Sequence, residues 1–443
     1  MDELNREEIE DLIKNSDAFC ILPFKHILLQ PGGFTTMCCM SPEQNVDDDG
    51  NMLLWDQVDF DKEIWQNKHY QKIRKNMING VKSSVCKRCY EQEDTGSESY
   101  RNGQNNRFLN NLHGSLDRKP RTEIESINVV TGNNHNHPTD WDIRMSRLCN
   151  LKCRMCGYMD SSQIYKEADE NTELQEYQGW QLNPEKDLLF NYDEKDPTYV
   201  LNTLPHVDRL KILGGEPTLD PKVQEVLDEA IRIGRNDIYL DITTNLTNVT
   251  DRWLESLGRF NDVQLQFSVD GTEKTNEYIR APSKWNQTEE NIQRYLNFTS
   301  STNTKFMLSF HQTISIYNIF DFWKLHEWIE SLRKDDKYKR IEQHFAWHVY
   351  VMHTPPELDP RILPIPYRAV ILRDFNKYKP NIKTDLGSIG VESIINLLEK
   401  HSQPDNVDEL LELWKKRTKV FDKVRGQNIK DYIPQVANLL NSG

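Results

Sequence analysis

Three cysteines with ligand-like spacing stand in the run Cys149-Asn-Leu-Lys-Cys153-Arg-Met-Cys156. Thiolates on one short loop can hold three irons of a four-iron cluster and leave the fourth iron open to a small molecule. A structural zinc site, by contrast, closes its coordination sphere with a fourth ligand. The nearest downstream histidine is His206, far along the chain. The spacing therefore favours a reactive iron–sulfur centre, and hence an enzyme, over a zinc site.

Strands and helices that could position this loop alternate from about residue 140 onward. The predicted strands are Trp141–Ser146, Arg209–Leu213, Ile238–Thr243, Val263–Val269, Phe306–Ile314 and Phe345–Met352. Apolar residues at helical spacing predict helices over Pro221–Ile233, Asn286–Leu296 and Ile319–Leu332. This alternation predicts an α/β fold, a partial (β/α)6 TIM-like barrel open on one side, with its site at the carboxyl ends of the strands. The polar stretch Asp160–Pro205 is a candidate lid or surface insertion.

Residues suited to binding follow these strands. The run Gly214-Gly215-Glu216-Pro217 comes after the second strand, Asn245 after the third, and Ser268 at the end of the fourth, with Arg280 beyond it. Glycines permit close backbone approach, a carboxylate and exposed carbonyls accept hydrogen bonds from an ammonium group, and arginine pairs bidentately with a carboxylate. Taken alone, the same residues also fit ordinary strand-end turns, with Asp270 shaping the turn at Gly271.

The C-x3-C-x2-C run after the first barrel strand, together with the GGEP segment, resembles the radical S-adenosylmethionine (SAM) enzymes. The resemblance implies a [4Fe–4S] cluster on Cys149, Cys153 and Cys156 whose open iron chelates SAM. It implies that SAM is cleaved reductively to a 5′-deoxyadenosyl radical that abstracts hydrogen from a substrate. The residues it assigns to SAM are Gly214, Gly215 and Glu216 for the amino group, Asn245 and Ser268 for the ribose, and Arg280 for the carboxylate. Met155 stands where the family usually has an aromatic residue.

A second group of cysteines precedes the barrel. Cys20, Gly33 and Cys38 form a C-x12-G-x4-C pattern, and Cys86 and Cys89 form a C-x2-C pattern. The arrangement resembles the SPASM/twitch auxiliary-cluster domains of radical SAM enzymes, here in an amino-terminal position. It implies a second, fully ligated [4Fe–4S] cluster that serves as an electron relay or positions substrate.

Two points about this second group stay open from the residues. A zinc staple remains an alternative to the cluster. Cys39 also neighbours Cys38, and the spacing from Gly33 favours Cys38 as the ligand.

The predicted organisation has four parts. These are a twitch domain over 1–112, short and irregular, a linker over 113–137, the radical SAM barrel over 138–358, and a helical carboxyl-terminal extension over 359–443. In the extension, an apolar stripe at helical spacing predicts a packing helix that stops at Gly426. The stripe consists of Val407, Leu410, Leu411, Trp414, Phe421 and Val424.

Composition limits the cellular setting and the partners. The net charge of −14 repels phosphate backbones, so nucleic acid is an unfavourable partner. No apolar run approaches the roughly 20 residues needed to span a bilayer, and the acidic first residues lack the core of a secretion signal. We therefore expect a cytoplasmic protein, in which eight clustered cysteines indicate metal binding rather than disulfides.

The predicted function is that of a radical SAM enzyme acting on a peptide or protein side chain, reduced by a partner such as a flavodoxin or ferredoxin. The alternatives are a sugar, nucleotide or other small-metabolite substrate, or a zinc-stabilised binding protein without catalysis. Four polar side chains on the last two strands, Tyr350, His348, Gln312 and His311, receive no catalytic assignment, since a satisfied core role is commoner.

Overall fold

The computed structural model describes residues 3–441 except for 42, 44, 48, 95–98, 113–125, 129–136, 179–195, 340, 342–343, 383–387 and 400–402. The chain divides into two compact units. Unit 1 consists of Met1–Ser146, Leu188–Gly214 and Pro221–Leu240, and unit 2 consists of Arg147–Asp187, Gly215–Asp220 and Asp241–Gly443. Within the described residues, every helix is too short or too polar to cross a lipid bilayer.

Unit 1 contains four strands in the order β6-β5-β2-β3, in which β6, β5 and β2 pair in parallel and β3 pairs antiparallel with β2. In the register, His26 lies opposite Asp140 and Asp140 lies opposite Arg209. The strands of this unit are β1 (Glu3–Asn5), β2 (His26–Leu29), β3 (Thr35–Thr36), β4 (Ser126–Asn128), β5 (Asp140–Ile143) and β6 (Arg209–Ile212). Its helices are α1 (Arg6–Asn15), α2 (Lys68–Ile78), α3 (Lys87–Asp94), α4 (Tyr100–Leu112), α7 (Thr198–Thr203) and α8 (Pro221–Arg232).

The region before the barrel is more regular than the sequence predicted. Helices α1 to α4 occupy much of the first 112 residues, and β2 pairs in parallel with β5. All four residues of β2 are buried, so polar and apolar residues do not alternate along it. This is why the sequence pattern did not predict it as a strand. The predicted linker lies mostly outside the described residues, and its described part, β4, pairs with β1.

Unit 2 holds the remaining strands, which run parallel in the order β7-β8-β9-β10-β11. These strands are β7 (Tyr239–Thr244, whose first two residues belong to unit 1), β8 (Asp262–Ser268), β9 (Lys305–Ile314), β10 (Phe345–Val351) and β11 (Ser388–Ile389). The helices are α5 (Ser162–Glu170), α6 (Thr172–Gln175), α9 (Asp251–Leu257), α10 (Glu273–Ile279), α11 (Trp285–Ser301) and α12 (Trp323–Arg333). The carboxyl-terminal helices are α13 (Ile365–Tyr378), α14 (Val391–Glu399), α15 (Val407–Arg425), α16 (Ile429–Tyr432) and α17 (Pro434–Ala437).

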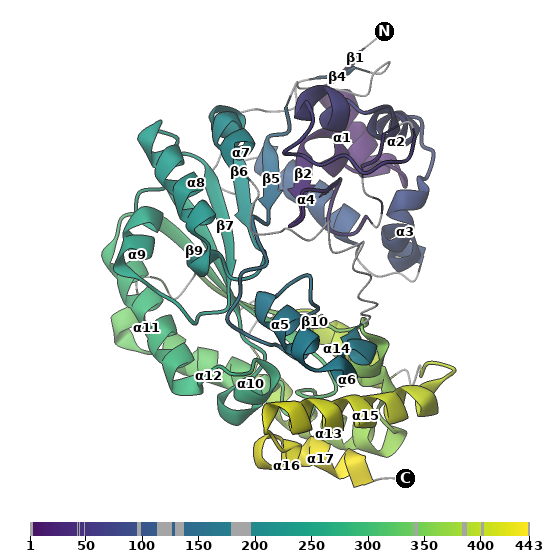
Figure 1. Cartoon of the computed structure of the whole chain (residues 1–443), viewed down its shortest axis with the longest axis vertical. Coiled ribbons are helices and arrows are strands. Elements are labelled where there is room, and N and C mark those ends of the chain that lie inside the picture. The colour runs from purple at the N-terminus through teal and green to yellow at the C-terminus, as the bar shows by residue number, and fades with distance from the viewer. Residues whose placement is uncertain are drawn as a thin grey trace. The chain divides into compact units, whose positions relative to one another are not determined.

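The two faces of the strands in unit 2 differ in chemistry. Along β8, Val263, Leu265 and Phe267 are buried, whereas the intervening residues are only half-buried. Helices α9, α11 and α12 lie along one side of the strands (Figure 1). Phe267, on the apolar face of β8, lies 5.3 Å from Tyr295 of α11 between ring centroids. Phe310 of β9 packs edge-to-face on Trp328 of α12 at 6.0 Å between ring centroids. The core therefore lies between these helices and the strands, and the opposite face is left for polar side chains.

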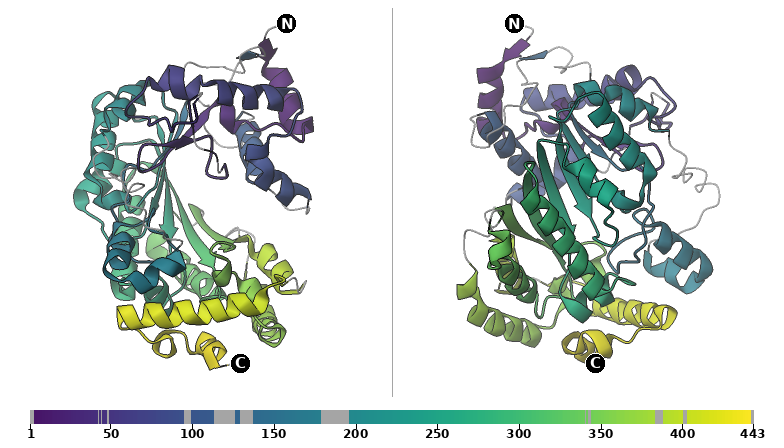
Figure 2. Two further views of the ribbon diagram at one scale, coloured as in Figure 1. Left: turned by 45° about the vertical axis from the view of Figure 1, so that its right-hand side comes forward. Right: turned by 90° about the vertical axis from the view of Figure 1, so that its left-hand side faces the viewer.

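The predicted fold class, a parallel α/β sheet followed by a helical region, is confirmed. The observed strands β6, β8 and β10 agree with the predicted ones to within one residue at each end. Helix α12 begins four residues after its predicted start at Ile319. The stripe in the extension forms α15, the long yellow helix of Figure 2, and Gly426 ends it in the left-handed conformation with φ of 60°.

Candidate active site

The three central cysteines lie on an irregular loop between β5 and α5. Cys149 and Cys153 are 8% and 5% exposed and pack with Leu151, while Cys156 is half-buried beside them. A hydrogen bond between the thiols of Cys153 and Cys156 lowers the pKa of Cys153 and raises that of Cys156. Burial raises the pKa of Cys149 to about 11. The sequence-predicted triad is therefore gathered into one largely buried group.

The start of α5 fixes the shape of this loop. The backbone N–H of Cys149 donates to Ser162 Oγ at 3.2 Å, and the N–H of Ser162 donates to the carbonyl of Arg147 at 2.8 Å. Ser161 Oγ donates to the carbonyl of Leu151 at 2.6 Å and also caps α5. Because the loop has no backbone ladder of its own, such side-chain bonds must satisfy its polar groups.

The glycine pair after β6 lies against backbone of the preceding loop. A Cβ atom on Gly215 would come within 2.3 Å of the carbonyl oxygen of Leu148. Gly214 has φ of 119°, which is unfavourable for other residues, and a Cβ there would come within 2.7 Å of the carbonyl oxygen of Ser146. The N–H of Glu216 then donates to the Leu148 carbonyl at 2.7 Å. Glycine is thus needed at Gly215 for contact with the loop that leads to Cys149.

Glu216 is buried, at 1% exposure, and both of its carboxylate oxygens are occupied by protein groups. Oε1 accepts from the hydroxyls of Thr218 at 2.7 Å and Thr244 at 2.8 Å, and Oε2 accepts from the N–H of Asn245 at 2.6 Å. Burial raises the pKa of Glu216, and these hydrogen bonds oppose that rise. The carboxylate therefore joins the end of β7 to the segment after the glycine pair.

Asn245 is brought next to the first cysteine. Its Nδ2 lies 3.6 Å from Cys149 Sγ and 3.2 Å from Asn150 Oδ1, and its Oδ1 accepts from the Thr247 hydroxyl at 2.6 Å. The side chain is buried, so this amide forms part of the wall beside the cysteine loop.

Arg280 approaches the same loop from the end of α10. Its Nε lies 2.7 Å from Asp270 Oδ2, and its Nη1 lies 4.0 Å from Cys153 Sγ. Burial disfavours the charge on this guanidinium, but Asp270 and the two nearby thiols raise its pKa above the usual value. Asp270 is fully buried and also accepts from the N–H of Thr313 at 2.8 Å. Asp270 therefore holds Arg280 with part of its guanidinium beside the cysteines.

Ser268 ends β8 on the half-buried polar face of unit 2, opposite His311 in the register. On that face Gln266 joins neighbouring strands, with Nε2 2.5 Å from Asp241 Oδ1 and Oε1 3.1 Å from the Thr243 hydroxyl. Asp241 and Gln266 were not singled out from the sequence, although the alternation of β8 places Gln266 on the same face as Ser268.

Three of the four lone polar candidates share this face. His311 stacks on His348 at 4.9 Å between ring centroids and lies 5.5 Å from the ring of Tyr350. Gln312 points the other way, is fully buried, and donates to the carbonyls of Asp270 and Phe322 at 3.2 Å. The strand alternation thus separates a core glutamine from an accessible aromatic group.

In unit 1, the amino-terminal thiols influence one another. Burial, followed by the neighbouring thiols of Cys38, Cys86 and Cys89, raises the pKa of Cys20. Burial likewise raises the pKa of Cys38 to about 12 and that of Cys86 to about 11. Cys39 is exposed. Four cysteines that the sequence grouped by spacing therefore lie in one neighbourhood.

An arginine braces this second group. Arg101 pairs with Glu93 at 2.6 Å and donates to the carbonyl of Phe19 at 2.6 Å. The bonds tie the segment after Cys89 to the residue before Cys20.

Among the residues that the structure describes, no three His, Cys, Asp or Glu side chains are placed to hold a single metal ion. One tetrahedral ion draws all its ligands to about 2.3 Å from a common point. In a cluster each thiolate binds its own iron, so the ligands stand farther apart.

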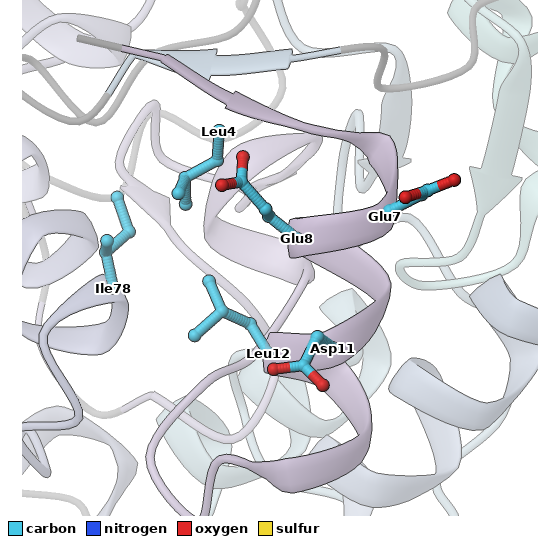
Figure 3. A pocket seen from close by; sticks show the side chains of 6 residues that line it. All are labelled: Leu4, Glu7, Glu8, Asp11, Leu12 and Ile78. Atoms are coloured by element: carbon cyan, nitrogen blue, oxygen red, sulfur yellow. The ribbon is translucent and has the colours of Figure 1, made fainter. Parts of the chain in front are cut away.

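A surface hollow of about 410 Å³ lies in unit 1 beside α1 (Figure 3). It is lined by Leu4, Glu7, Glu8, Asp11, Leu12 and Ile78. Glu8 is engaged in capping α1, where it accepts from the N–H of Asn5 at 2.8 Å. The hollow holds no predicted site residue, so we assign it no part in the chemistry.

Comparison with known proteins gives one family match. Residues 143–322 match the model of the radical SAM superfamily, a range that includes the cysteine loop and the segment from Gly214 to Arg280. No curated protein sequence matches the chain.

Similar solved structures include Streptococcus suis SuiB bound to S-adenosylmethionine, with 15% identity, a TM-score of 0.31, and 55% of this chain and 45% of that chain covered. SuiB bound to the precursor peptide SuiA gives 12% identity and a TM-score of 0.32, over 67% of this chain and 60% of that one. Native anSMEcpe with bound AdoMet gives 16% identity and a TM-score of 0.30, over 53% of this chain and 58% of that one. The chain thus spans less than two thirds of each.

Gly215→Ala should displace the loop before Cys149, because its Cβ has no room against the Leu148 carbonyl. We expect a loss of about 1–3 kcal/mol in the free energy of unfolding, as in overpacked cores, and reduced iron retention after reconstitution. Urea denaturation and iron analysis would measure both. The matched control is Gly157→Ala, directly after Cys156, where the nearest atom would be Asp160 Oδ2 at 3.6 Å. Equal behaviour of the two variants would contradict the prediction.

Proposed function

We propose, from the match of residues 143–322 to the radical SAM superfamily, that this enzyme cleaves SAM reductively at a [4Fe–4S] cluster on Cys149, Cys153 and Cys156. The observation that carries the proposal is the meeting of three largely buried thiols with Asn245 and Arg280 at one loop. When bound, the reduced cluster and SAM supply a 5′-deoxyadenosyl radical that abstracts hydrogen from the substrate.

The protein residues bind and orient the cofactor. Arg280 uses its Nε to pair with Asp270. The terminal N–H groups of its guanidinium would donate hydrogen bonds to the SAM carboxylate. Asn245 and Ser268 would bind the ribose. The segment of Gly214, Gly215 and Glu216 would receive the amino group through its backbone carbonyls, because the Glu216 carboxylate is already occupied within the protein.

The substrate, in this proposal, is a peptide or protein side chain that binds along the polar face of β7 to β10. Two observations support a hydrogen-bonding substrate there: the Asp241–Gln266 pair, and the stack of His311 on His348 beside the exposed Tyr350. The amino-terminal cysteine pattern supports a peptide, since SPASM and twitch enzymes often modify peptides. A sugar, nucleotide or other small metabolite is the second candidate.

We further propose that Cys20, Cys38, Cys86 and Cys89 hold a second [4Fe–4S] cluster in an amino-terminal twitch domain. The influence of Cys38, Cys86 and Cys89 on the pKa of Cys20 supports it, and Cys38 is half-buried whereas Cys39 is exposed, which supports Cys38 as the ligand. A cluster there would give the enzyme an electron relay. A flavodoxin- or ferredoxin-type protein would be the reductant.

Replacing Cys149, Cys153 or Cys156 by alanine should abolish formation of 5′-deoxyadenosine from SAM and dithionite, because the cluster would lose one of its three protein ligands. Replacing Cys86 and Cys89 should spare part of this reaction. Chromatography of anaerobic reaction mixtures would measure the product. Cys39→Ala is the matched control and should behave like the unmodified protein, since Cys39 is exposed. Equal abolition by both sets of variants would mean that the two sites are wrongly assigned.

Anaerobic reconstitution with iron and sulfide should give a brown protein with about eight irons per chain, four for each cluster. Chelation of the iron should bleach it. Iron, sulfide and zinc analysis would measure the content. Colourless protein with tightly bound zinc would instead support a zinc-stabilised binding protein without catalysis.

Incubation of the reduced enzyme with SAM and candidate peptides should change the mass of a peptide by the loss of hydrogen, which mass spectrometry would detect. His311→Ala should weaken this turnover while 5′-deoxyadenosine still forms without substrate, because His311 lies on the polar face and not on the cysteine loop. Turnover only of a sugar or nucleotide would disprove the peptide assignment.

A further inference from the structure

The loop that carries the cysteines is attached to the carboxyl-terminal helix α15. Arg154, between Cys153 and Cys156, is 1% exposed. Its Nη2 donates to Asp422 Oδ1 at 2.6 Å, and its guanidinium lies 3.6 Å from the ring centroid of Tyr278. The Tyr278 hydroxyl donates to the same Asp422 oxygen at 2.8 Å. One carboxylate of α15 therefore fixes both the loop arginine and the aromatic ring beneath it.

A second arginine of α15 holds the loop backbone. Arg417 is 2% exposed and donates to the carbonyl oxygen of Arg154 at 2.8 Å. Its other terminal nitrogen donates to Glu357 Oε1 at 2.6 Å, and Glu357 is also buried. The peptide group that follows Arg154 is thus bound to a guanidinium whose own position is fixed by an ion pair.

The end of α15 adds an ion-pair link next to Cys153. Arg425 pairs with Glu167 of α5 at 2.7 Å, and Lys152 lies 3.2 Å from the same carboxylate. On the other side of the loop, the N–H groups of Lys152 and Arg154 donate to the carbonyls of Ala281 and Ile279 at 2.6 and 2.7 Å. The cysteine loop is therefore held between the Arg280 segment and α15.

These contacts exceed what packing alone requires. A helix that merely covers a core needs an apolar stripe, which α15 has, and its polar residues would face water. Instead it places Arg417 and Asp422 against buried polar groups of the loop, where arginine's planar fork fixes geometry. Groups that orient metal ligands from outside typically change metal affinity or activity by about 10–100-fold when altered.

We propose that α15 is a positioning element for the cluster loop, with Arg154, Asp422 and Arg417 as positioning residues that hold Cys153 and Cys156 in ligating geometry. The proposal rests on the assignment of the cluster to this loop. It gives the carboxyl-terminal extension a part in cofactor assembly and SAM binding.

The test compares Arg154→Lys and Asp422→Asn with Lys423→Gln as the matched control. Lys423 neighbours Asp422 on α15, and its side chain is 72% exposed and pairs with Glu173 at 3.0 Å, away from the loop. In the iron-free protein, the alkylation rates of Cys153 and Cys156, measured per cysteine by mass spectrometry, should rise in the first two variants and stay unchanged in the control. Cys20, buried in the other unit, is the internal reference and should not change.

After reconstitution, the first two variants should bind iron at this loop, or form 5′-deoxyadenosine, about 10–100-fold less well. The change that SAM causes in the electron paramagnetic resonance spectrum of the reduced cluster should also be weakened. Arg154→Lys keeps the positive charge but loses the planar guanidinium. If this variant behaved like the control, the hydrogen-bond geometry of Arg154 would not position the loop.

Thermal melting of the iron-free variants separates folding from positioning, and Asp422→Asn decides the outcome if Arg154→Lys does not fold. Alkylation, iron content and spectra equal to those of Lys423→Gln in a folded Asp422→Asn would overturn the proposal. If the unmodified protein itself bound no iron and formed no 5′-deoxyadenosine, the assigned function would fail instead. The two failures are thus distinguishable.

Discussion

The burial of Arg154 within the cysteine loop is the constraint on which the arrangement of the site depends. A guanidinium removed from water is costly unless a counter-charge and hydrogen-bond acceptors surround it. Asp422 supplies the charge, Tyr278 supplies a ring face and a carbonyl, and Gln427 accepts at 2.9 Å. Together these contacts hold Arg154 in place, so a segment without helix or strand acquires a definite shape. The positions of the Cys153 and Cys156 thiols, on either side of Arg154, are fixed with it.

The strands of unit 2 provide the second feature that the site needs, because one of their faces is apolar and packed whereas the other is polar. Phe267 and Phe310 pack beneath the helices on one face. On the other face, Gln266 and His311 are joined to polar neighbours and stay half-buried. A parallel sheet whose faces were both covered by helices would be apolar on both. The polar face therefore leaves a surface that a hydrogen-bonding substrate can use at the strand ends that carry Asn245 and Ser268.

Much of this was predictable from sequence, for reasons that are local. The alternation of apolar and polar residues predicts strand β8, and the spacing of the cysteines predicts the cysteine loop. Hydrogen bonds between residues far apart in the sequence were not predictable. Asp422 lies 268 positions after Arg154, and Thr244 lies 28 positions after Glu216. The sequence predicted that the Glu216 carboxylate and exposed carbonyls of its segment bind an ammonium group, and only the fold shows that the carboxylate oxygens already accept from protein groups. The apolar stripe of α15 predicted a packing helix correctly but carried no sign of its polar contacts.

Buried arginines lie near the cysteine loop of a protein that is acidic as a whole. The chain as a whole has a net charge of −14. The hydrogen bond with Cys156 lowers the pKa of the Cys153 thiol most, and Arg280 and Arg425 lower it further, whereas burial and Asp270 oppose them. The carboxylates that accompany these arginines, Asp270 and Glu167, are turned to them and fully paired. Because buried charges are screened little by solvent, these arginines and their carboxylate partners influence the thiols more strongly than the exposed surface charge does.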